Sequence, residues 1–214
     1  MATYVKQHCW SRLLRMFHWM YALSIVFLVT TGFYINNPWT QTMIEGSASF
    51  PMATMRYIHF IAAYVFSAAV LIRLYLYLFG NAQERVWDIL PLTRRNIKNL
   101  RMTLLQYSYV SNNHDERLGH NVLAGLYYLV TFFAATLMVS SGFFMLYPET
   151  PFWAGWGITL FGSQQSARYL HHITMWWFIL FPVVHIYFCI WNDCQEPEGM
   201  ISSIFNGAKF KHKT

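Results

Sequence analysis

The feature that most constrains the fold is the apolar stretch of residues 168–193, RYLHHITMWWFILFPVVHIYFCIWND. A helix needs about 20 predominantly apolar residues to cross the hydrocarbon core of a bilayer, and this stretch is long enough. It nevertheless contains His171, His172 and His185. Ionisable side chains are costly inside a membrane helix and usually mark a functional site. The stretch therefore predicts a transmembrane helix whose histidines bind a ligand or cofactor.

Two of these histidines are spaced so that they share one face of the helix. His171 and His185 are 14 residues apart, which is two heptads, so their rings lie on nearly the same side with a drift of roughly 40°. Their separation along the helix axis is about 21 Å. His172 points about 100° away from His171, which indicates a surface or supporting role. Two imidazoles at two depths on one face favour two stacked cofactors, and haem is the first candidate.

Composition and three further apolar stretches place the whole chain in a membrane. Of the 214 residues, 56% are hydrophobic and 11% are charged, whereas a soluble domain carries about 25% charged residues. We expect an all-α membrane protein, a single domain over residues 1–214 that forms a four-helix transmembrane bundle binding two b haems. The expected helices cover residues 13–35, 54–79, 119–146 and 169–192.

The segments between these helices are polar or interfacial. Residues 80–118 form the longest one, and its middle, residues 93–110, is expected to be a short amphipathic helix on the membrane surface. Residues 147–168 are rich in Trp and Gly and indicate an interfacial loop, and the chain ends in a mixed-charge tail. Three cysteines without CxxC or CxxCH spacing argue against structural disulfides, zinc and covalent c-type haem.

The basic residues determine the expected orientation. The N-terminal segment, the 80–118 segment and the tail carry 3, 6 and 3 Lys or Arg, whereas the two loops on the other side carry only Arg56 and Arg168. Basic residues concentrate on the cytoplasmic side of membrane proteins. We therefore expect a multi-pass protein of the bacterial cytoplasmic (inner) membrane with both termini in the cytoplasm. The net charge of +6 then reflects topology and does not indicate nucleic-acid binding.

This orientation pairs four histidines by depth. His18 lies near the cytoplasmic end of the first helix, and His59 lies near the outer end of the second. The fourth helix starts outside, so we expect His171 to join His59 on the iron of an outer haem. His185 is expected to join His18 on the iron of an inner haem. A lone buried histidine can be a satisfied core residue, and zinc needs about four ligands around one metal, which two separated pairs do not provide.

Arg73 is the only charged residue well inside one of the expected helices. It follows His59 by 14 residues, which places it level with the inner haem. Two interpretations stay open: the guanidinium pairs with a haem propionate or a nearby negative charge, or it snorkels to the cytoplasmic surface. His8, His114 and His212 lie in polar segments and are assigned no role.

Several motifs in a fixed order carry a resemblance to a known family. They are RMFHW at 15–19, RYIHF at 56–60, LIRLYLYLFGN at 71–81, LGHN at 118–121, HHITMW at 171–176 and VHIY at 184–187. Over nearly its whole length the chain resembles the b-type cytochrome subunit of membrane-bound NiFe-hydrogenases, which is related to the cytochrome subunit of formate dehydrogenase and to cytochrome b561. The HH pair departs from relatives with a single ligand at that turn; the Met-Trp register favours His171, and His172 stays open.

The resemblance implies partners, a direction of electron flow and a quinone pocket. In that family the outer haem receives electrons from iron–sulfur clusters of a hydrogenase small subunit, which has its own C-terminal transmembrane helix and binds the NiFe large subunit. The inner haem passes them to a quinone, either menaquinone or ubiquinone. The family's quinone pocket corresponds here to Gly119, His120 and Asn121. The side chains of His120 and Asn121 can donate hydrogen bonds, and His120 is expected to change charge near neutral pH. Helix capping is the competing explanation for this turn.

The prediction for the whole chain is a di-haem cytochrome subunit of an uptake hydrogenase. It would transfer electrons and reduce quinone without splitting hydrogen itself. Moving one electron across the membrane changes its free energy by about 2.3 kcal/mol for each 100 mV of membrane potential. Arg15, Arg56, Arg73 and His172 are candidates for contacts with haem propionates or for supporting the ligands. Alternatives are a formate dehydrogenase cytochrome, a free-standing cytochrome b561, or a haem-free anchor or transporter. The expected helices contain no Asp or Glu, which argues against a proton-coupled transporter.

Overall fold

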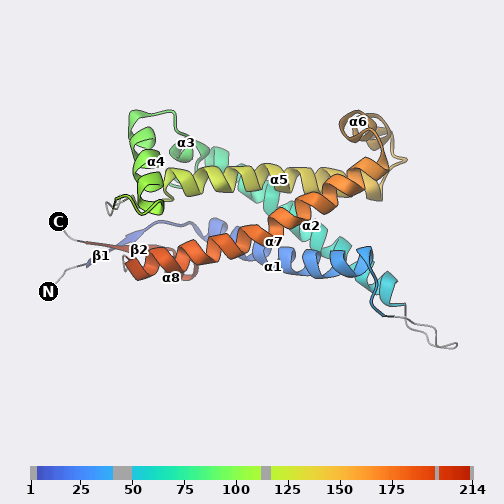
Figure 1. Ribbon diagram of the computed structural model, residues 1–214, viewed down its shortest axis with the longest axis horizontal. Helices are drawn as coiled ribbons and strands as arrows, with labels where there is room; N and C mark the ends of the chain where they lie inside the picture. The colour runs from blue at the N-terminus through green and yellow to red at the C-terminus, as the bar shows by residue number, and fades with distance from the viewer. Residues whose placement is uncertain (1–3, 41–49, 112–116, 196–197, 213–214) are drawn as a thin grey trace. The chain divides into compact units, whose positions relative to one another are not determined.

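The computed structural model describes residues 4–40, 50–111, 117–195 and 198–212, and helices dominate it (Figure 1). Four helices are long and apolar enough to cross a membrane: α1 (Arg12–Asn36), α2 (Pro51–Phe79), α5 (Val122–Leu146) and α7 (Gln164–Gln195). The four predicted helices are therefore confirmed, with ends that differ by at most five residues. His114, which was assigned no role, and residues 112–116 of the predicted polar segment lie outside the described residues.

The ends of these helices follow local chemistry. α2 begins at Pro51, whose fixed φ suits the first helical position. α5 begins three residues later than predicted because Asn121 caps it, with Oδ1 accepting the backbone N–H of Ala124 at 2.7 Å. α7 begins five residues earlier than predicted, since the hydroxyl of Ser163 accepts the backbone N–H of Ser166 at 3.1 Å and starts the helix in a polar turn.

The chain forms two compact units, and each of the four long helices contributes residues to both. The first unit comprises Met1–His18, Leu71–Phe133 and Phe181–Thr214, and the second comprises Trp19–Val70 and Ala134–Leu180. The candidate iron ligands divide between them: His18 and His185 belong to the first unit, whereas His59 and His171 belong to the second.

In the first unit the two ends of the chain pair as strands. β1 (Tyr4–His8) and β2 (Ala208–His212) are antiparallel neighbours (Figure 1). The connection into β2 is made by Gly207, whose φ is 82° and whose carbonyl accepts the backbone N–H groups of Cys9 and Trp10 at 2.8 and 3.0 Å. The all-helical prediction missed this sheet, because pairing between segments 200 residues apart leaves no periodic signal in either one.

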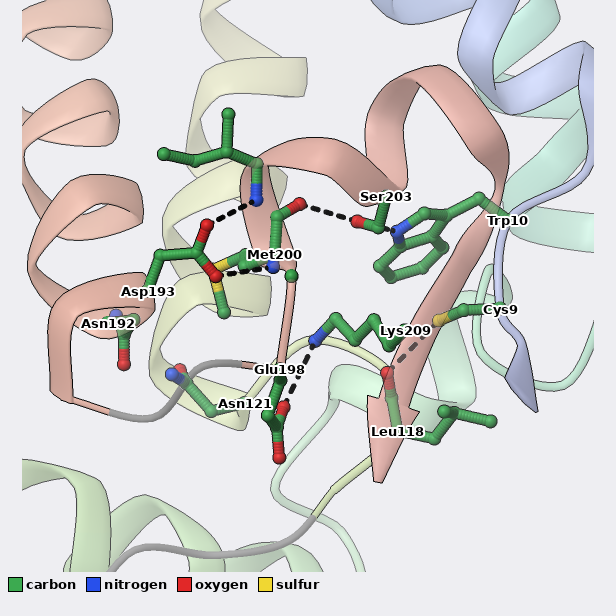
Figure 2. A network of polar contacts seen from close by, with 12 residues as sticks. Cys9, Trp10, Leu118, Asn121, Asn192, Asp193, Glu198, Met200, Ser203 and Lys209 are labelled. Atoms are coloured by element: carbon green, nitrogen blue, oxygen red, sulfur yellow. Dashed lines mark hydrogen bonds and ion pairs between the residues drawn. The ribbon is translucent and has the colours of Figure 1, made fainter. Parts of the chain in front are cut away.

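The predicted polar tail also contains a helix, α8 (Met200–Asn206). The carboxylate of Asp193, near the end of α7, accepts the backbone N–H of Met200 at 2.6 Å. The indole Nε1 of Trp10 donates to the hydroxyl of Ser203 at 3.0 Å (Figure 2). These bonds attach α8 both to α7 and to the N-terminal segment.

Two helices fill the long segment between α2 and α5 in the first unit. They are α3 (Val86–Ile89) and α4 (Arg94–Tyr107). The hydroxyl of Thr93 caps α4 by accepting the backbone N–H of Asn96 at 3.2 Å. The prediction of a short helix within residues 93–110 is confirmed.

The second unit contains a helix where the sequence predicted an interfacial loop. Residues 147–168 include α6 (Pro151–Phe161), so that prediction is wrong. The ring of Phe144 on α5 stacks on Phe161, with centroids 5.7 Å apart. A Cβ on Gly157 would meet the Phe144 ring at 2.2 Å, so only glycine permits this approach. Glycines lower the helix propensity of this segment, and tertiary packing compensates for it.

Candidate functional site

In the second unit, His59 on α2 and His171 on α7 are each held by a hydroxyl of another helix. The Nδ1 of His59 lies 2.8 Å from the hydroxyl oxygen of Thr31 on α1, and the Nδ1 of His171 lies 2.8 Å from that of Ser141 on α5. Each hydroxyl donates its own hydrogen to the backbone carbonyl four residues earlier, at 2.6 and 2.7 Å. With its hydrogen used in this way, each hydroxyl oxygen accepts a hydrogen bond from Nδ1–H of the histidine. This fixes the tautomer and leaves Nε2 of both imidazoles with a lone pair that can bind a metal.

A glycine follows each of these hydroxyls and lies beside the imidazole. A Cβ placed on Gly32 would lie 3.7 Å from Cε1 of His59, and one placed on Gly142 would lie 3.5 Å from Cε1 of His171. Each glycine therefore brings its backbone close to the ring, and the sulfur of Met175 would lie 3.8 Å from a Cβ on Gly32. The pattern occurs twice, as TTGF at residues 30–33 and SSGF at 140–143.

In the first unit, His18 on α1 and His185 on α7 face each other. Their ring centroids are 6.3 Å apart with an interplanar angle of 51°. Bonds from imidazole nitrogen to a metal are about 2.0–2.1 Å, so two imidazoles on opposite sides of one ion have centroids about 6 Å apart. The phenol oxygen of Tyr128 lies 3.2 Å from Nδ1 of His185. The separation of the two rings fits axial ligation of a single iron.

The turn of Gly119, His120 and Asn121 lies next to this second ligand pair in the first unit. The His120 ring stacks on Trp10, with centroids 4.5 Å apart, and meets the Tyr128 ring edge-on at 4.7 Å. Tyr128 is also the residue that contacts His185. Thus one aromatic side chain connects the predicted quinone turn with a predicted iron ligand.

The electrostatics of His120 differ from the sequence-based expectation. Burial lowers the pKa of His120 well below its ordinary value, and the nearby positive charge of Lys209 lowers it further. The ring is therefore neutral at neutral pH and does not change charge there. A neutral imidazole still offers one donor and one acceptor, which suits a hydrogen bond to a carbonyl or hydroxyl oxygen.

Asn121 has two roles in the structure. Its Oδ1 caps α5, which supports the capping explanation for this turn. Its Nδ2 donates to the phenol oxygen of Tyr107 on α4 at 3.2 Å, and Asn192 on α7 donates to the same oxygen at 3.3 Å. Capping uses only the oxygen, so it does not account for the position of the amide nitrogen.

Arg73 is buried, with 7% of its surface exposed, so its side chain does not snorkel. The guanidinium carbon lies 4.0 Å from the ring centroid of Tyr77 and 5.7 Å from that of Phe17. Among the described residues, neither Nη1 of Arg73 nor the hydroxyl of Tyr77 finds a hydrogen-bond partner. A buried donor without a partner is costly. Both atoms therefore fit a further acceptor such as a haem carboxylate.

The other candidate supporting residues are placed differently. Arg15 donates through Nη1 to the carbonyl of Phe205, and its Nε has no partner within the described part of the chain. Arg56 is exposed and lines a surface hollow of about 400 Å³ in the second unit. His172 contacts the Trp176 ring edge-on at 6.5 Å, whereas His171 has the tautomer-fixing bond. The geometry favours His171 as the ligand.

Residues 9–207 match the sequence family described as "Prokaryotic cytochrome b561". The chain belongs to this family. Similar proteins include the "Probable Ni/Fe-hydrogenase B-type cytochrome subunit" of Cupriavidus necator, 33% identical over 96% of this chain and 86% of the relative. The protein of that name from Azotobacter vinelandii is 32% identical over 91% of this chain and 84% of its own length. The "Probable Ni/Fe-hydrogenase 1 B-type cytochrome subunit" of Escherichia coli K12 is 26% identical over 98% of this chain and 92% of its own length.

As a prokaryotic cytochrome b561, the chain must hold haem b, and its histidine pairs fit that cofactor. Six-coordinate haem iron takes two axial ligands from the protein, so a pair of imidazoles is sufficient. The described residues contain no group of three or more His, Cys, Asp and Glu side chains that could hold a metal ion. The family match and these relatives confirm the resemblance to the b-type cytochrome subunit of NiFe-hydrogenases within the cytochrome b561 superfamily.

The sequence analysis missed the residues that contact the candidate iron ligands. Thr31 and Ser141 were not singled out, nor were Tyr128 and the two glycines beside the rings. The similarity of TTGF and SSGF was a usable signal, since a hydroxyl followed by glycine recurs on two helices. Nothing comparable in the sequence marks Tyr128.

Proposed function

We propose that this chain is the di-haem cytochrome subunit of a membrane-bound NiFe-hydrogenase. His59 and His171 would bind one haem iron, and His18 and His185 would bind the other. The observation that carries the proposal is the arrangement of the four imidazoles: His18 and His185 face each other, and three of the four rings have Nδ1 within hydrogen-bond distance of a hydroxyl or phenol oxygen. The names of the relatives favour a hydrogenase over formate dehydrogenase as the partner. Bound haem supplies one-electron chemistry, which would connect iron–sulfur clusters of the hydrogenase small subunit to a quinone.

The residues of this chain would orient and isolate the cofactors. Thr31 and Ser141 hold the imidazoles in the tautomer that leaves Nε2 unprotonated, and Gly32 and Gly142 keep the space beside the rings open. Arg73 and the Tyr77 hydroxyl supply buried donors for a propionate in the first unit. Apolar outward-facing side chains on the long helices keep the assembly in the bilayer.

The distribution of basic residues supports an orientation with both termini in the cytoplasm of a bacterial inner-membrane protein. The pair His59 and His171 would then form the outer haem site, near the periplasmic small subunit and its C-terminal transmembrane helix. The pair His18 and His185 would form the inner site. Menaquinone or ubiquinone would be reduced beside Gly119, His120 and Asn121, where Tyr128 connects the turn to His185.

The proposal is tested by counting haems and assigning each one to its ligands. The purified chain should contain two haem b groups in a pyridine haemochrome assay, both low-spin and six-coordinate. His59→Ala or His171→Ala should remove one haem, and His18→Ala or His185→Ala should remove the other. His172→Ala is the matched control and should retain both. One haem per chain in the wild type would contradict the two-pair arrangement.

The partnership needs a separate measurement. An affinity-tagged chain, extracted from its source membrane in mild detergent, should co-purify with an iron–sulfur small subunit and a nickel-containing large subunit. Metal analysis of that complex should therefore find nickel. A complex with molybdenum or tungsten and no nickel would assign the chain to a formate dehydrogenase.

A further inference from the structure

Helix α4 buries a polar face, unlike a typical helix at the surface of a soluble protein. Its buried face consists of the polar residues Asn96, Asn99 and Thr103, which are 4%, 2% and 4% exposed. Its outward face carries Ile97 and Leu104, which are 54% and 47% exposed. A surface helix normally buries its apolar stripe and exposes its polar one. The buried polar residues and the exposed apolar ones together indicate that the surroundings of this outward face are not simply water.

The polar inner face is explained by the bonds that attach α4 to the first unit. Nδ2 of Asn96 donates to the carbonyl of Leu90 at 2.7 Å, and its Oδ1 accepts from Nη1 of Arg117 at 3.2 Å. Oδ1 of Asn99 accepts the backbone N–H of Val122, the first residue of α5, at 2.8 Å. Buried polar groups satisfied in this way hold an element in one position. Helix α4 therefore presents a fixed outer face.

The outer face combines apolar and positively charged side chains. Arg94, Arg95, Lys98 and Arg101 are all exposed, and α4 contains no acidic residue. Within the described part of the chain, none of the four forms an ion pair or a hydrogen bond through its side chain. At 100° per residue, Arg94 and Arg101 lie at the centre of the face, and Ile97 and Leu104 lie together on one flank.

Exposed apolar residues continue on both sides of α4. Trp87 and Leu92 precede it and are 66% and 70% exposed, and Tyr109 and Val110 follow it at 76% and 71%. Figure 1 shows α4 running crosswise to the first turns of α5, which is a membrane span. Because Asn99 bonds to the first residue of that span, α4 lies at the level where the span leaves the bilayer. A helix in the membrane plane with apolar and basic residues on one face suits the interface between headgroups and acyl chains.

We propose that the outer face of α4 is a binding surface for anionic phospholipids. Arg94, Lys98 and Arg101 would contact the headgroup phosphates, and Ile97 and Leu104 would enter the acyl layer. Charge complementarity decides the occupant, since four unpaired cations on a rigid helix with no acid attract an anionic surface. The surface is separate from the predicted haem and quinone residues, so the proposal stands without the proposed function.

The first test compares lipid retention by two charge-matched variants of the purified, haem-loaded protein. Arg94→Gln/Arg101→Gln removes two charges from the centre of the face. Lys6→Gln/Arg12→Gln removes two exposed basic residues elsewhere in the first unit and is the control. Binding of phosphatidylglycerol from mixed micelles at low salt should weaken about tenfold in the first variant, because each basic residue near an anionic surface contributes about fivefold at most. The control and the binding of phosphatidylcholine should not change.

The second test measures the depth of the helix in vesicles of phosphatidylglycerol and phosphatidylcholine. A nitroxide on Ile97→Cys, in a variant with the native cysteines replaced, should be accessible to oxygen and protected from a water-soluble nickel chelate. A nitroxide on Arg95→Cys should show the reverse, because position 95 lies on the other flank of the outward face from Ile97. Unchanged haem spectra establish that each variant is folded. Equal lipid binding by both charge variants, or a nitroxide at position 97 exposed to water, would overturn the proposal. The proposal would also be overturned if the protein formed a dimer that Arg94→Gln/Arg101→Gln dissociated without any loss of lipid binding. The outer face of α4 would then contact a second copy of the chain.

Discussion

At the scale of single residues, the second unit builds the same support for an imidazole twice. Thr31 and Ser141 come from different helices, yet each accepts a hydrogen bond from Nδ1–H of a histidine and precedes a glycine beside that ring. In the first unit the partner of His185 is the phenol of Tyr128, at a longer 3.2 Å. A hydrogen bond from Nδ1 increases the basicity of a ligating imidazole. The two proposed haem sites therefore differ in the strength of ligand support.

Removing one hydroxyl should change the potential of one haem. Thr31→Val keeps the shape of the side chain but removes the acceptor for His59, so the imidazole becomes a weaker donor and the reduced haem is favoured. The midpoint potential of that haem should rise, by roughly 60 mV for each tenfold loss of preference for the oxidised form. Redox titration followed by visible absorbance measures the change.

The neighbouring hydroxyl provides the control for this experiment. Thr30→Val removes a hydroxyl that bonds only to backbone carbonyls of its own helix, at 2.9 and 3.1 Å. Both potentials should then stay at their wild-type values. Equal shifts in Thr30→Val and Thr31→Val would show that the Thr31 hydroxyl does not act through His59.

At the scale of elements, the turn before α5 raises the question of whether Asn121 is a cap or a quinone ligand. The two roles use different atoms: Oδ1 caps α5 at Ala124, whereas Nδ2, which donates to Tyr107 in the structure, would supply the hydrogen bond to quinone. Asn121→Ser keeps a good capping oxygen and removes the amide donor, whereas Asn121→Ala removes both and should cost about 1 kcal/mol of stability. If the turn binds quinone, Asn121→Ser should slow haem reoxidation by a quinone analogue about tenfold with normal stability.

Stopped-flow reoxidation measures this difference, and the haem spectra and thermal stability serve as internal controls. Wild-type reoxidation in Asn121→Ser, together with reduced stability in Asn121→Ala, would identify the turn as a cap alone. Slow reoxidation in both variants would support the quinone role.

The link between the chain ends depends on one backbone conformation. Gly207 has a φ of 82°, and an added Cβ would lie 2.8 Å from Cε1 of His8 and 2.9 Å from the carbonyl oxygen of Trp10. Gly207→Ala should therefore destabilise the first unit by about 1–3 kcal/mol. Thermal loss of haem absorbance should begin at a lower temperature, and the haem of His18 and His185 should be lost first.

Gly155→Ala is the matched control for this substitution. It adds the same methyl group to a helical glycine of the second unit, where, beyond the backbone of its own helix and its two chain neighbours, the new Cβ would meet no atom of the described residues within 4 Å. It should leave the thermal transition unchanged or raise it slightly, because alanine is the better helix former. Equal destabilisation by both variants would show that the backbone conformation of Gly207 is not the cause of the lost stability.

The sequence predicted those elements whose signal is local. The length of the apolar stretches gave the four spans, and the spacing of the basic and apolar residues gave α4. It failed where structure depends on contacts distant in the chain, as in the pairing of β1 with β2 and the packing of α6 through Gly157 on Phe144. The depth argument also placed His18 with His185, which the structure brings face to face, but could not identify Tyr128 as the neighbour that supports His185 or Thr31 as the one that supports His59.

At the scale of the whole molecule, the basic residues predict which face of the membrane each segment occupies. The N-terminal segment, the segment between α2 and α5, and the tail carry most of the Lys and Arg. The bonds of the first unit join parts of all three: Cys9 donates to the carbonyl of Leu118, and β1 pairs with β2. All three segments must therefore share one side, and the positive charge predicts that this side is the cytoplasm.

The native cysteines allow this orientation to be tested without new labelling sites. Cys194, near the end of α7, is exposed, whereas Cys9 is 1% exposed. Burial raises the pKa of the Cys9 thiol to about 12 despite the opposing charge of Lys209. Since the thiolate is the reactive form, Cys9 should stay unmodified at pH 7.5 in the folded protein. A membrane-impermeant maleimide should label one cysteine in inverted membrane vesicles and none in intact spheroplasts. Cys194→Ser should abolish that labelling, and detergent unfolding should restore reaction at Cys9. Labelling of Cys194 from the outside of spheroplasts would reverse the orientation and would exchange the outer and inner assignments of the two haem sites.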